Sequence, residues 1–282
     1  MERFSFESDI DGWLIQCFKW PVAGAKASVV VAHGMAEHAQ RYQRFAEALN
    51  QAGFDVVAMD HRAHGCTSGP SGLGDFGDGG WDALVADIEQ LVQITRATQP
   101  ARPVVLFGHS MGAAAAQQYA PLYSHNIDGL VLSGTTLRDP GEPIPDYNAA
   151  FQPQRTAYDW LSRDELEVDA YINDPLCGFE GQRVKNGMDR TDPRRVDAEL
   201  LAKIRNNLPV LLVAGDADPV NRNLQGIHYL IQKWQEAGIQ HIASQLYAGG
   251  RHEMLNETNR VEVTNNIIQW IERVVANDVL DN

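Results

Sequence analysis

Short apolar runs alternate with longer amphipathic stretches along most of the chain. The apolar runs, rich in valine, leucine and isoleucine, predict β-strands at residues 13–18, 29–32, 56–59, 104–107, 129–132, 210–214 and 241–247. The amphipathic stretches predict α-helices at 41–51, 81–98, 113–124, 224–237 and 260–276. Strands that alternate with helices of this length indicate an α/β protein with a mostly parallel sheet covered on both faces.

The alternation stops between residues 134 and 205, where proline, aspartate, arginine and aromatic residues are frequent. Helical patterns are visible there at 162–173 and 197–205. The stretch is too long for a plain connection, and its aromatic residues give it enough apolar mass to fold. We therefore expect a core formed by 1–133 and 206–282, with 134–205 inserted as a cap. Four aromatic residues are predicted to form its inner wall: Phe151, Tyr158, Trp160 and Phe179.

A possible nucleophile lies in Gly108-His109-Ser110-Met111-Gly112, between the strand at 104–107 and the helix that follows. A Gly-x-Ser-x-Gly motif at a strand-to-helix turn is typical of a nucleophile elbow, in which the glycines allow close packing and the serine occupies a strained, exposed turn. The alternative is an ordinary turn with a small polar residue. His109 is expected to pack beside the site, because neighbouring residues on a sharp turn point apart.

A serine nucleophile needs a base, and the base needs an orienting acid. In this fold the chain order is serine, acid, histidine, each after a strand. His252 follows the strand at 241–247, and both Asp216 and Asp218 follow the strand at 210–214. We prefer Asp218, because it lies farther beyond the strand end, where the loop can turn toward Ser110. Asp216 remains the alternative.

An oxyanion intermediate requires two backbone N–H donors. The amide of Met111, at the start of the helix after Ser110, is the first candidate. The second is the amide of Met35, in the loop after the strand at 29–32, where Gly34 permits the turn. Glu37 and Glu253 are expected to hold neighbouring loops by hydrogen bonds.

The formal net charge of −14 and pI near 5.0 argue against nucleic acid or an anionic membrane as the main partner. No secretory signal is visible, and the charge-free stretch 103–127 is broken by polar residues, so we expect no stable membrane insertion. Three widely separated cysteines favour a reducing compartment, the cytoplasm. The oligomeric state cannot be predicted.

Three other motifs are better explained structurally. His61 and His64 have no further ligand placed to complete a metal site, and the glycine-rich segment 72–80 has aspartates and lacks P-loop spacing. Cys66 and Cys177 are expected to pack as small side chains. No metal and no cofactor are expected.

Several motifs together resemble the monoacylglycerol lipase and lysophospholipase-like branch of the α/β-hydrolases. They are His33-Gly34-Met35-Ala36-Glu37-His38, Arg41-Tyr42, Asp60-His61-Arg62-Ala63-His64-Gly65, the motif around Ser110, and Arg251-His252-Glu253. The segments 160–164 and 173–179 are similar to caps of bacterial members. The resemblance implies an eight-stranded, mostly parallel sheet and a serine ester hydrolase without metal or organic cofactor. Ala63 departs from the glycine usual in the family.

These observations favour a serine carboxylic ester hydrolase with Ser110, Asp218 and His252 as catalytic residues. Its predicted substrates are small molecules: short-to-medium acyl esters or monoacyl lipids of the monoacylglycerol or lysophospholipid type. Substrate-binding residues are expected at Gly34, His109, Phe151, Tyr158, Trp160 and Phe179. Two alternatives remain open: the same triad acting on an amide, peptide or other non-lipid bond, and an inactive binding module on a hydrolase scaffold.

Overall fold

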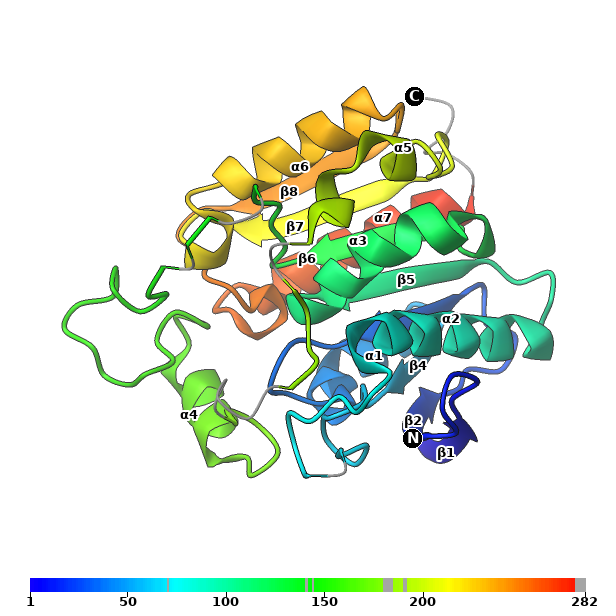
Figure 1. The fold of residues 1–282 in the computed structure, drawn as a ribbon, viewed down its shortest axis with the longest axis horizontal. Coiled ribbons are helices and arrows are strands. Elements are labelled where there is room, and N and C mark those ends of the chain that lie inside the picture. The colour runs from blue at the N-terminus through cyan, green and yellow to red at the C-terminus, as the bar shows by residue number, and fades with distance from the viewer. Residues whose placement is uncertain (70, 140–141, 144, 180–184, 190–191, 277–282) are drawn as a thin grey trace.

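The strands form one eight-stranded sheet in the order β1-β2-β4-β3-β5-β6-β7-β8 (Figure 1). The computed structural model describes residues 1–69, 71–139, 142–143, 145–179, 185–189 and 192–276. Antiparallel pairing joins β1 to β2 and β2 to β4, and the remaining strands are parallel. The strands are β1 (Glu2–Glu7), β2 (Leu14–Trp20), β3 (Ser28–Ala32), β4 (Asp55–Met59), β5 (Val104–His109), β6 (Gly129–Ser133), β7 (Val210–Gly215) and β8 (Ile242–Tyr247).

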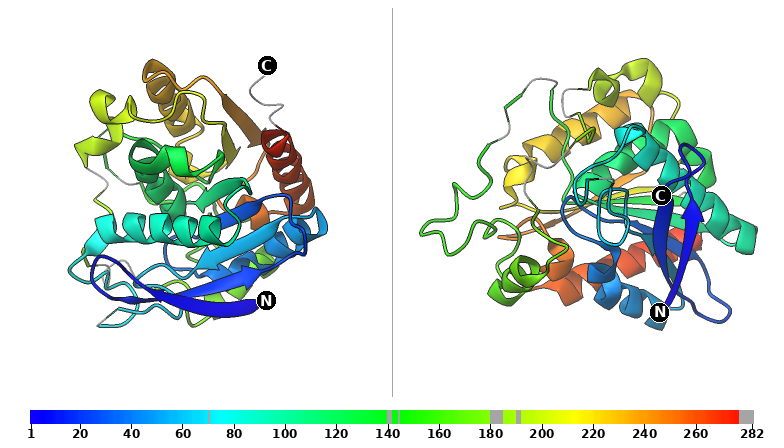
Figure 2. Two further views of the ribbon diagram at one scale, coloured as in Figure 1. Left: turned by 90° about the vertical axis from the view of Figure 1, so that its right-hand side faces the viewer. Right: turned by 60° about the horizontal axis from the view of Figure 1, so that its bottom comes forward.

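Helices cover both faces of this sheet (Figures 1 and 2). On one face, α2 (Gly80–Thr98), α3 (Met111–Tyr123) and α6 (Gln225–Glu236) pack against side chains such as Val104 and Leu106. On the other face, α1 (Gln43–Gln51) and α7 (Arg260–Val275) pack against Val105 and Phe107. Successive residues of β5 thus enter different cores, which explains why the central strands are apolar at every position.

The pattern of buried runs does not reveal β1, which lies at the edge of the sheet and is polar at alternate positions. Its Phe4 and Phe6 are half-buried and pack against the core, while Glu2, Arg3, Ser5 and Glu7 are exposed. An edge strand with one solvated face has this alternation. All seven predicted strands are present, with ends that differ from the prediction by one or two residues.

The segment between β6 and β7 contains α4 (Glu165–Asn173), the short 3₁₀ helix η4 (Pro193–Val196) and α5 (Ala198–Leu201). In Figure 1, α4 lies away from the sheet, beyond its left edge, whereas α5 lies beside α6. Leu201 and Ile204 are buried in the same core cluster as α3 and α6. The last part of the expected cap therefore packs against the core of the sheet and its helices, and the proposed boundary at residue 205 remains a prediction.

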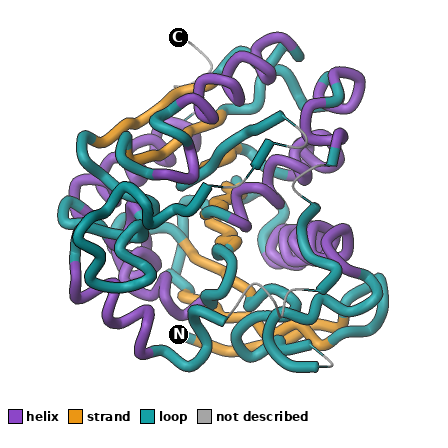
Figure 3. The backbone as a smooth tube through the Cα atoms, turned by 60° about the vertical axis from the view of Figure 1, so that its left-hand side comes forward, coloured by secondary structure: helices purple, strands orange, loops and turns teal. Residues whose placement is uncertain are grey.

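The loops that follow β3, β5, β7 and β8 contribute Gly34, Ser110, Val220 and His252 to the wall of one cavity. Figure 3 turns the left-hand side of Figure 1 forward, where loops surround the ends of strands. Parallel strands bring their carboxyl ends to one edge of the sheet, where ligands bind in open α/β folds. Within the described part of the chain, no helix has the length and apolar character needed to cross a membrane.

Candidate active site

Ser110 occupies the sharp turn between β5 and α3. Its backbone φ of +51° lies in the left-handed region that residues other than glycine seldom adopt. A Cβ on Gly108 would lie 2.6 Å from the carbonyl oxygen of Gly112, so these glycines allow the strand and the helix to approach closely. The local geometry is therefore that of a nucleophile elbow, with Ser110 on the wall of a cavity.

His252 lies between Ser110 and Asp218 and is hydrogen-bonded to both. Its Nε2 is 2.8 Å from Oγ of Ser110, and its Nδ1 is 3.0 Å from Oδ2 of Asp218. Asp216 instead accepts a hydrogen bond from the amide of Gly249, at 2.7 Å. The structure thus brings Ser110, His252 and Asp218 into one hydrogen-bonded chain and leaves Asp216 outside it.

Asp218 is fully buried and His252 nearly so. Burial lowers the pKa of a histidine, but the adjacent Asp218 carboxylate more than offsets this and raises the pKa of His252 above its ordinary value. Oδ1 of Asp218 accepts a hydrogen bond from the amide of Val220, at 2.8 Å, which fixes the orientation of the carboxylate. His252 is therefore a stronger base than a free histidine and is held in one orientation.

The loop after β3 places Gly34 and Met35 on the wall of the same cavity as Ser110. A Cβ on Gly34 would lie 3.3 Å from Cβ of Ser110 and 3.2 Å from Cδ2 of His109, so a side chain there would crowd the serine. Met111 also lines the cavity, and as the first residue of α3 its N–H has no acceptor within the helix. Both methionines thus lie where amide donors to an oxyanion are expected.

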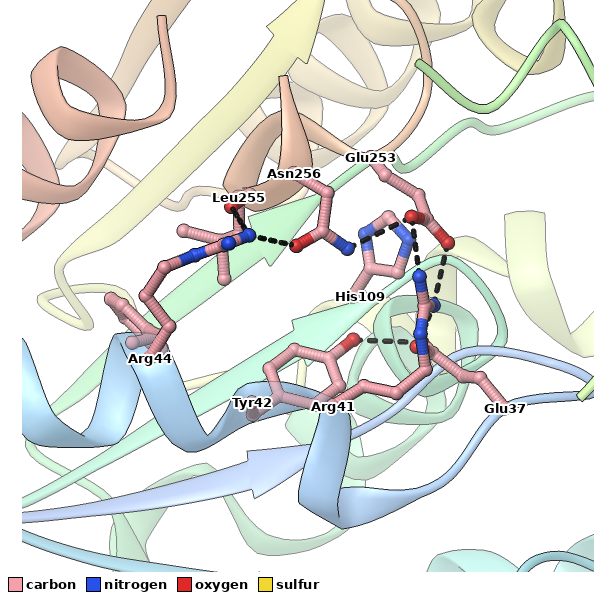
Figure 4. Close-up of a pocket in the computed structure, with 9 residues that line it drawn as sticks. Glu37, Arg41, Tyr42, Arg44, His109, Glu253, Leu255 and Asn256 are labelled. Atoms are coloured by element: carbon pink, nitrogen blue, oxygen red, sulfur yellow. Dashed lines mark hydrogen bonds and ion pairs between the residues drawn. The ribbon is translucent and has the colours of Figure 1, made fainter. Parts of the chain in front are cut away.

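A buried ion-pair network joins two loops of the site (Figure 4). Arg41 donates to Glu37 at 2.6 Å and to both carboxylate oxygens of Glu253, at 2.7 and 2.9 Å. Glu37 also accepts hydrogen bonds from the Tyr42 hydroxyl at 2.8 Å and from the Gly34 amide at 2.5 Å. Burial raises the pKa of both carboxyl groups, but Arg41 outweighs this and lowers it. The charged network fixes the loop after β3 relative to the loop that carries His252.

A cavity of about 450 Å³ opens beside Ser110 and His252. Five of the six residues predicted to bind substrate line it: Gly34, His109, Tyr158, Trp160 and Phe179. Its wall also includes residues that the sequence pattern does not single out for binding: Thr135, Thr136, Arg138, Tyr147, Tyr171, Met188, Arg195 and Val220. Tyr147 and Tyr171 are among the aromatic residues that were expected to let segment 134–205 fold as a cap. Their aromatic character is the feature of the sequence that could have pointed to them.

Phe151, the sixth predicted residue, lines a separate hollow. The guanidinium carbon of Arg251 lies 4.2 Å from the centre of its ring, a cation–π contact. The prediction rested on aromatic character alone, which does not say to which side of a loop a ring turns.

The segment 134–205 contacts the loop of His252 directly. The ring centres of Trp160 and His252 are 4.9 Å apart, as are those of His109 and His252. The carbonyl oxygen of Trp160 accepts a hydrogen bond from the His252 amide at 3.4 Å, and that of Leu161 accepts one from the Glu253 amide at 2.8 Å. A displacement of Trp160 or Leu161 would therefore alter the contacts of His252, the proposed base.

Three buried histidines pack behind the loop after β3. The ring centre of His33 is 4.3 Å from that of His61 and 5.2 Å from that of His64. Burial lowers the pKa of all three, to about 4 for His64, so the rings are neutral. Ala63, between His61 and His64, has φ +71°, a left-handed conformation that favours glycine.

An α/β sheet with a serine elbow and a Ser–His–Asp chain at the carboxyl ends of its strands defines the α/β-hydrolases. The chain belongs to the family described as serine aminopeptidase, S33, which matches residues 23–259. It is a member of the monoacylglycerol lipase-like branch and a hydrolase of the lipase and esterase group.

Two relatives and one solved structure illustrate this placement. Human monoglyceride lipase is 30% identical over 281 residues, covering 94% of this chain and 88% of its own. The monoacylglycerol lipase of Mycolicibacterium smegmatis is 29% identical over 277 residues, covering 89% and 90%. A thermostable carboxyl esterase from Bacillus coagulans, solved with glycerol, superposes with a TM-score of 0.85 at 27% identity, covering 97% of this chain and 98% of the esterase.

Proposed function

We propose that the chain is a serine carboxylic ester hydrolase that acts through an acyl-enzyme on Ser110. Its proposed substrates are short-to-medium acyl esters and monoacyl lipids of the monoacylglycerol or lysophospholipid type. The observation that carries the proposal is the hydrogen-bonded chain from Ser110 through His252 to Asp218, at the wall of a 450 Å³ cavity. Cavities of this size accommodate small organic ligands.

In the proposed reaction, Nε2 of His252 takes the proton of Ser110 as Oγ attacks the ester carbonyl carbon. The amides of Met35 and Met111 stabilise the resulting oxyanion, and Asp218 stabilises the imidazolium. His252 then protonates the departing alcohol, which leaves an acyl group on Ser110. A water molecule, deprotonated by His252, hydrolyses that ester and regenerates the enzyme.

The cavity wall supports an ester with one apolar chain. It presents the apolar side chains of Met35, Met111 and Ala114, together with the aromatic rings of Tyr158 and Trp160. The same wall also supplies hydroxyl groups and charges, among them those of Thr135, Thr136, Arg138 and Arg195. An apolar wall with a few polar groups suits an acyl chain attached to a small polar alcohol. The relatives named for monoglyceride hydrolysis agree with this class of substrate.

The experiment that tests the proposal has two parts. A fluorophosphonate probe should label the wild-type protein and should not label Ser110→Ala. Absence of labelling in the folded wild type would favour the inactive binding module instead. A panel of p-nitrophenyl esters and monoacylglycerols should then be compared with aminoacyl p-nitroanilides, because the family description includes aminopeptidases. Faster turnover of the anilides would replace the esterase proposal by a peptidase.

We further propose a cytoplasmic location. All three cysteines, Cys17, Cys66 and Cys177, are free thiols in the structure. Unpaired cysteines are typical of proteins from a reducing compartment. Fractionation of the native host followed by immunodetection tests the proposal, and recovery in the medium or the membrane fraction would contradict it.

A further inference from the structure

Three side chains with different metal-binding atoms meet where the loop after β3 touches the segment 134–205. His38 belongs to that loop, whereas Asp174 and Cys177 follow α4. A ring nitrogen of His38, a carboxylate oxygen of Asp174 and Sγ of Cys177 lie within 4.8 Å of one another. We propose that His38, Asp174 and Cys177 form a binding site for a thiophilic divalent cation, of which Zn²⁺ is the type. This proposal does not depend on what the cavity hydrolyses.

The chemistry of the three atoms selects the class of cation. One thiolate, one imidazole and one carboxylate are the ligand types that Zn²⁺ takes, at about 2.3, 2.0 and 2.0 Å. Ca²⁺ and Mg²⁺ prefer all-oxygen sites, so the thiol disfavours them. On binding, the Cys177 thiol releases its proton to solvent and its sulfur bonds to the cation. A water molecule would supply the fourth ligand, since the Asp174 side chain is 29% exposed.

The local backbone already holds these atoms close to a chelating arrangement. Oδ1 of Asp174 accepts a hydrogen bond from the Leu176 amide at 2.9 Å, and its carbonyl oxygen accepts one from the Cys177 amide at 3.0 Å. This turn leaves Oδ2 of Asp174 for Nε2 of His38, 2.8 Å away. In a tetrahedral site the two atoms would be about 3.3 Å apart, so they need to separate by roughly 0.5 Å. The required movement is within side-chain reach.

The surrounding charge favours a cation. Glu37, next to His38 in the sequence, belongs to the network in which Arg41 binds both Glu37 and Glu253. Two carboxylates against one guanidinium leave this network net negative. A divalent cation entering the site would offset that excess, and the low exposure of His38 limits screening by water.

A bound cation would connect two parts of the chain that border the cavity. Glu37, next to His38 in the sequence, and Gly178, next to Cys177, line the cavity, as does Ala36. The amide of Gly178 donates to the carbonyl oxygen of Ala36 at 2.9 Å, so the two segments are already in contact. Coordination would add a second, stronger connection and reduce the motion of this wall.

Co²⁺ is the probe that tests the site, because the absorption spectrum of bound Co²⁺ depends on which atoms coordinate it. Titration of the full-length, reduced protein with CoCl₂ should produce a thiolate-to-cobalt charge-transfer band that Zn²⁺ then abolishes. Cys177→Ser should remove the band and weaken Zn²⁺ binding by roughly 10–100-fold or more. Asp174→Asn should keep the band and weaken binding. The matched control is Cys66→Ser, which removes an exposed cysteine elsewhere and should leave both readouts unchanged.

Three results would overturn the proposal: no band in the wild type, a band that persists in Cys177→Ser, or a band lost in Cys66→Ser. Circular dichroism checks that each variant is folded. If Cys177→Ser does not fold, hydrogen exchange of the wild type decides. Zn²⁺ should slow exchange in residues 34–39 and 174–178, and an unchanged rate in both segments would contradict the site.

Discussion

Arg41 binds Glu253 through two of its guanidinium nitrogens, at 2.7 and 2.9 Å, although the two residues are 212 positions apart in the sequence. The pair joins the 3₁₀ helix η1 (Ala39–Tyr42) to the loop of His252. Their side chains are 11% and 6% exposed. A charge so deeply buried is tolerated because it is paired, and removing its partner leaves it uncompensated.

We therefore predict that Arg41→Gln destabilises the protein by about 3–5 kcal/mol at neutral pH, since Glu37 and Glu253 would be left as buried, unpaired carboxylates. Urea unfolding followed by circular dichroism measures the loss. The control is Arg44→Gln. Arg44 pairs with Glu167, but the Arg44 side chain is half-exposed. That change should cost less than about 1 kcal/mol. Equal losses in the two variants would show that the network has no special role.

Ser110→Ala and His252→Ala should each abolish nearly all esterase activity, by about 10⁶ in turnover, because nucleophile and base act as one unit. The double variant should be no worse than either single one. Turnover of p-nitrophenyl butyrate measures the loss, and urea unfolding confirms that the fold is retained. A residual activity within tenfold of the wild type would place the nucleophile elsewhere.

The two aspartates after β7 should differ sharply. Asp218→Asn is expected to lower turnover by about 10⁴, because an amide at this position favours the wrong tautomer of His252. Asp216→Asn changes a residue that binds the Gly249 amide and should lower turnover less than tenfold. The ratio of the two losses is the readout, and a larger effect at Asp216 would contradict our assignment of the acid.

The sequence predicts the sheet, its helices and the order of Ser110, Asp218 and His252 because these follow from local patterns. Hydrophobic periodicity marks buried strands, and the topology then brings their carboxyl ends together. The strand β1 was not predicted, because it lies at the sheet edge and one of its faces is exposed to solvent. Its Phe4 and Phe6 alternate with polar residues, a weaker signal than a continuous apolar run.

Contacts between distant segments could not be predicted in this way. The Arg41–Glu253 pair joins two loops of the core that are 212 positions apart in the sequence. The meeting of His38 with Asp174 depends on how the segment 134–205 folds over the core. That segment has no regular periodicity, so the sequence shows which rings are available but not where they turn. Phe151 illustrates the limit, because it lies against Arg251 in a separate hollow.

Buried neutral histidines should make the fold sensitive to acid. Burial lowers the pKa of His64 and His109 to about 4, and that of His33 and His61 well below the ordinary value. Below pH 6.5 the unfolded chain therefore binds more protons than the folded one, and stability falls as the pH falls. Each histidine that stays neutral in the folded state lowers the free energy of unfolding by about 1.4 kcal/mol for each pH unit below 6.5.

Urea unfolding at pH 7, 6 and 5 tests this expectation. Between pH 7 and 6.5 the raised pKa of His252 opposes this trend, because the folded state binds that proton first. Below pH 6.5 its stabilising contribution is complete and no longer alters the slope. His64→Asn removes one of the protonation sites and should reduce the slope between pH 6 and 5. Stability that stays constant over this range would show that the buried rings do not control acid unfolding.

The proposed substrates are dissolved molecules, so turnover should not require an oil–water interface. Interfacial binding needs an exposed apolar patch of substantial area. The exposed large apolar side chains described on α4 are Leu166 and Ile172, at 78% and 43%, and the acidic residues Glu165 and Asp169 lie on the same helix. Charged groups beside so small an apolar surface oppose docking on a lipid droplet.

We accordingly expect p-nitrophenyl butyrate and medium-chain monoacylglycerol to follow smooth saturation curves across their solubility limits. Leu166→Ser and Ile172→Ser should leave kcat/KM for the butyrate ester within about twofold, because surface substitutions of this kind change little. Trp160→Ala is the contrasting variant. Its ring contacts His252 and lines the cavity, so its loss should raise KM for the monoacylglycerol. A steep rise in rate when an emulsion forms, abolished by Leu166→Ser, would instead show that α4 is an interfacial lid.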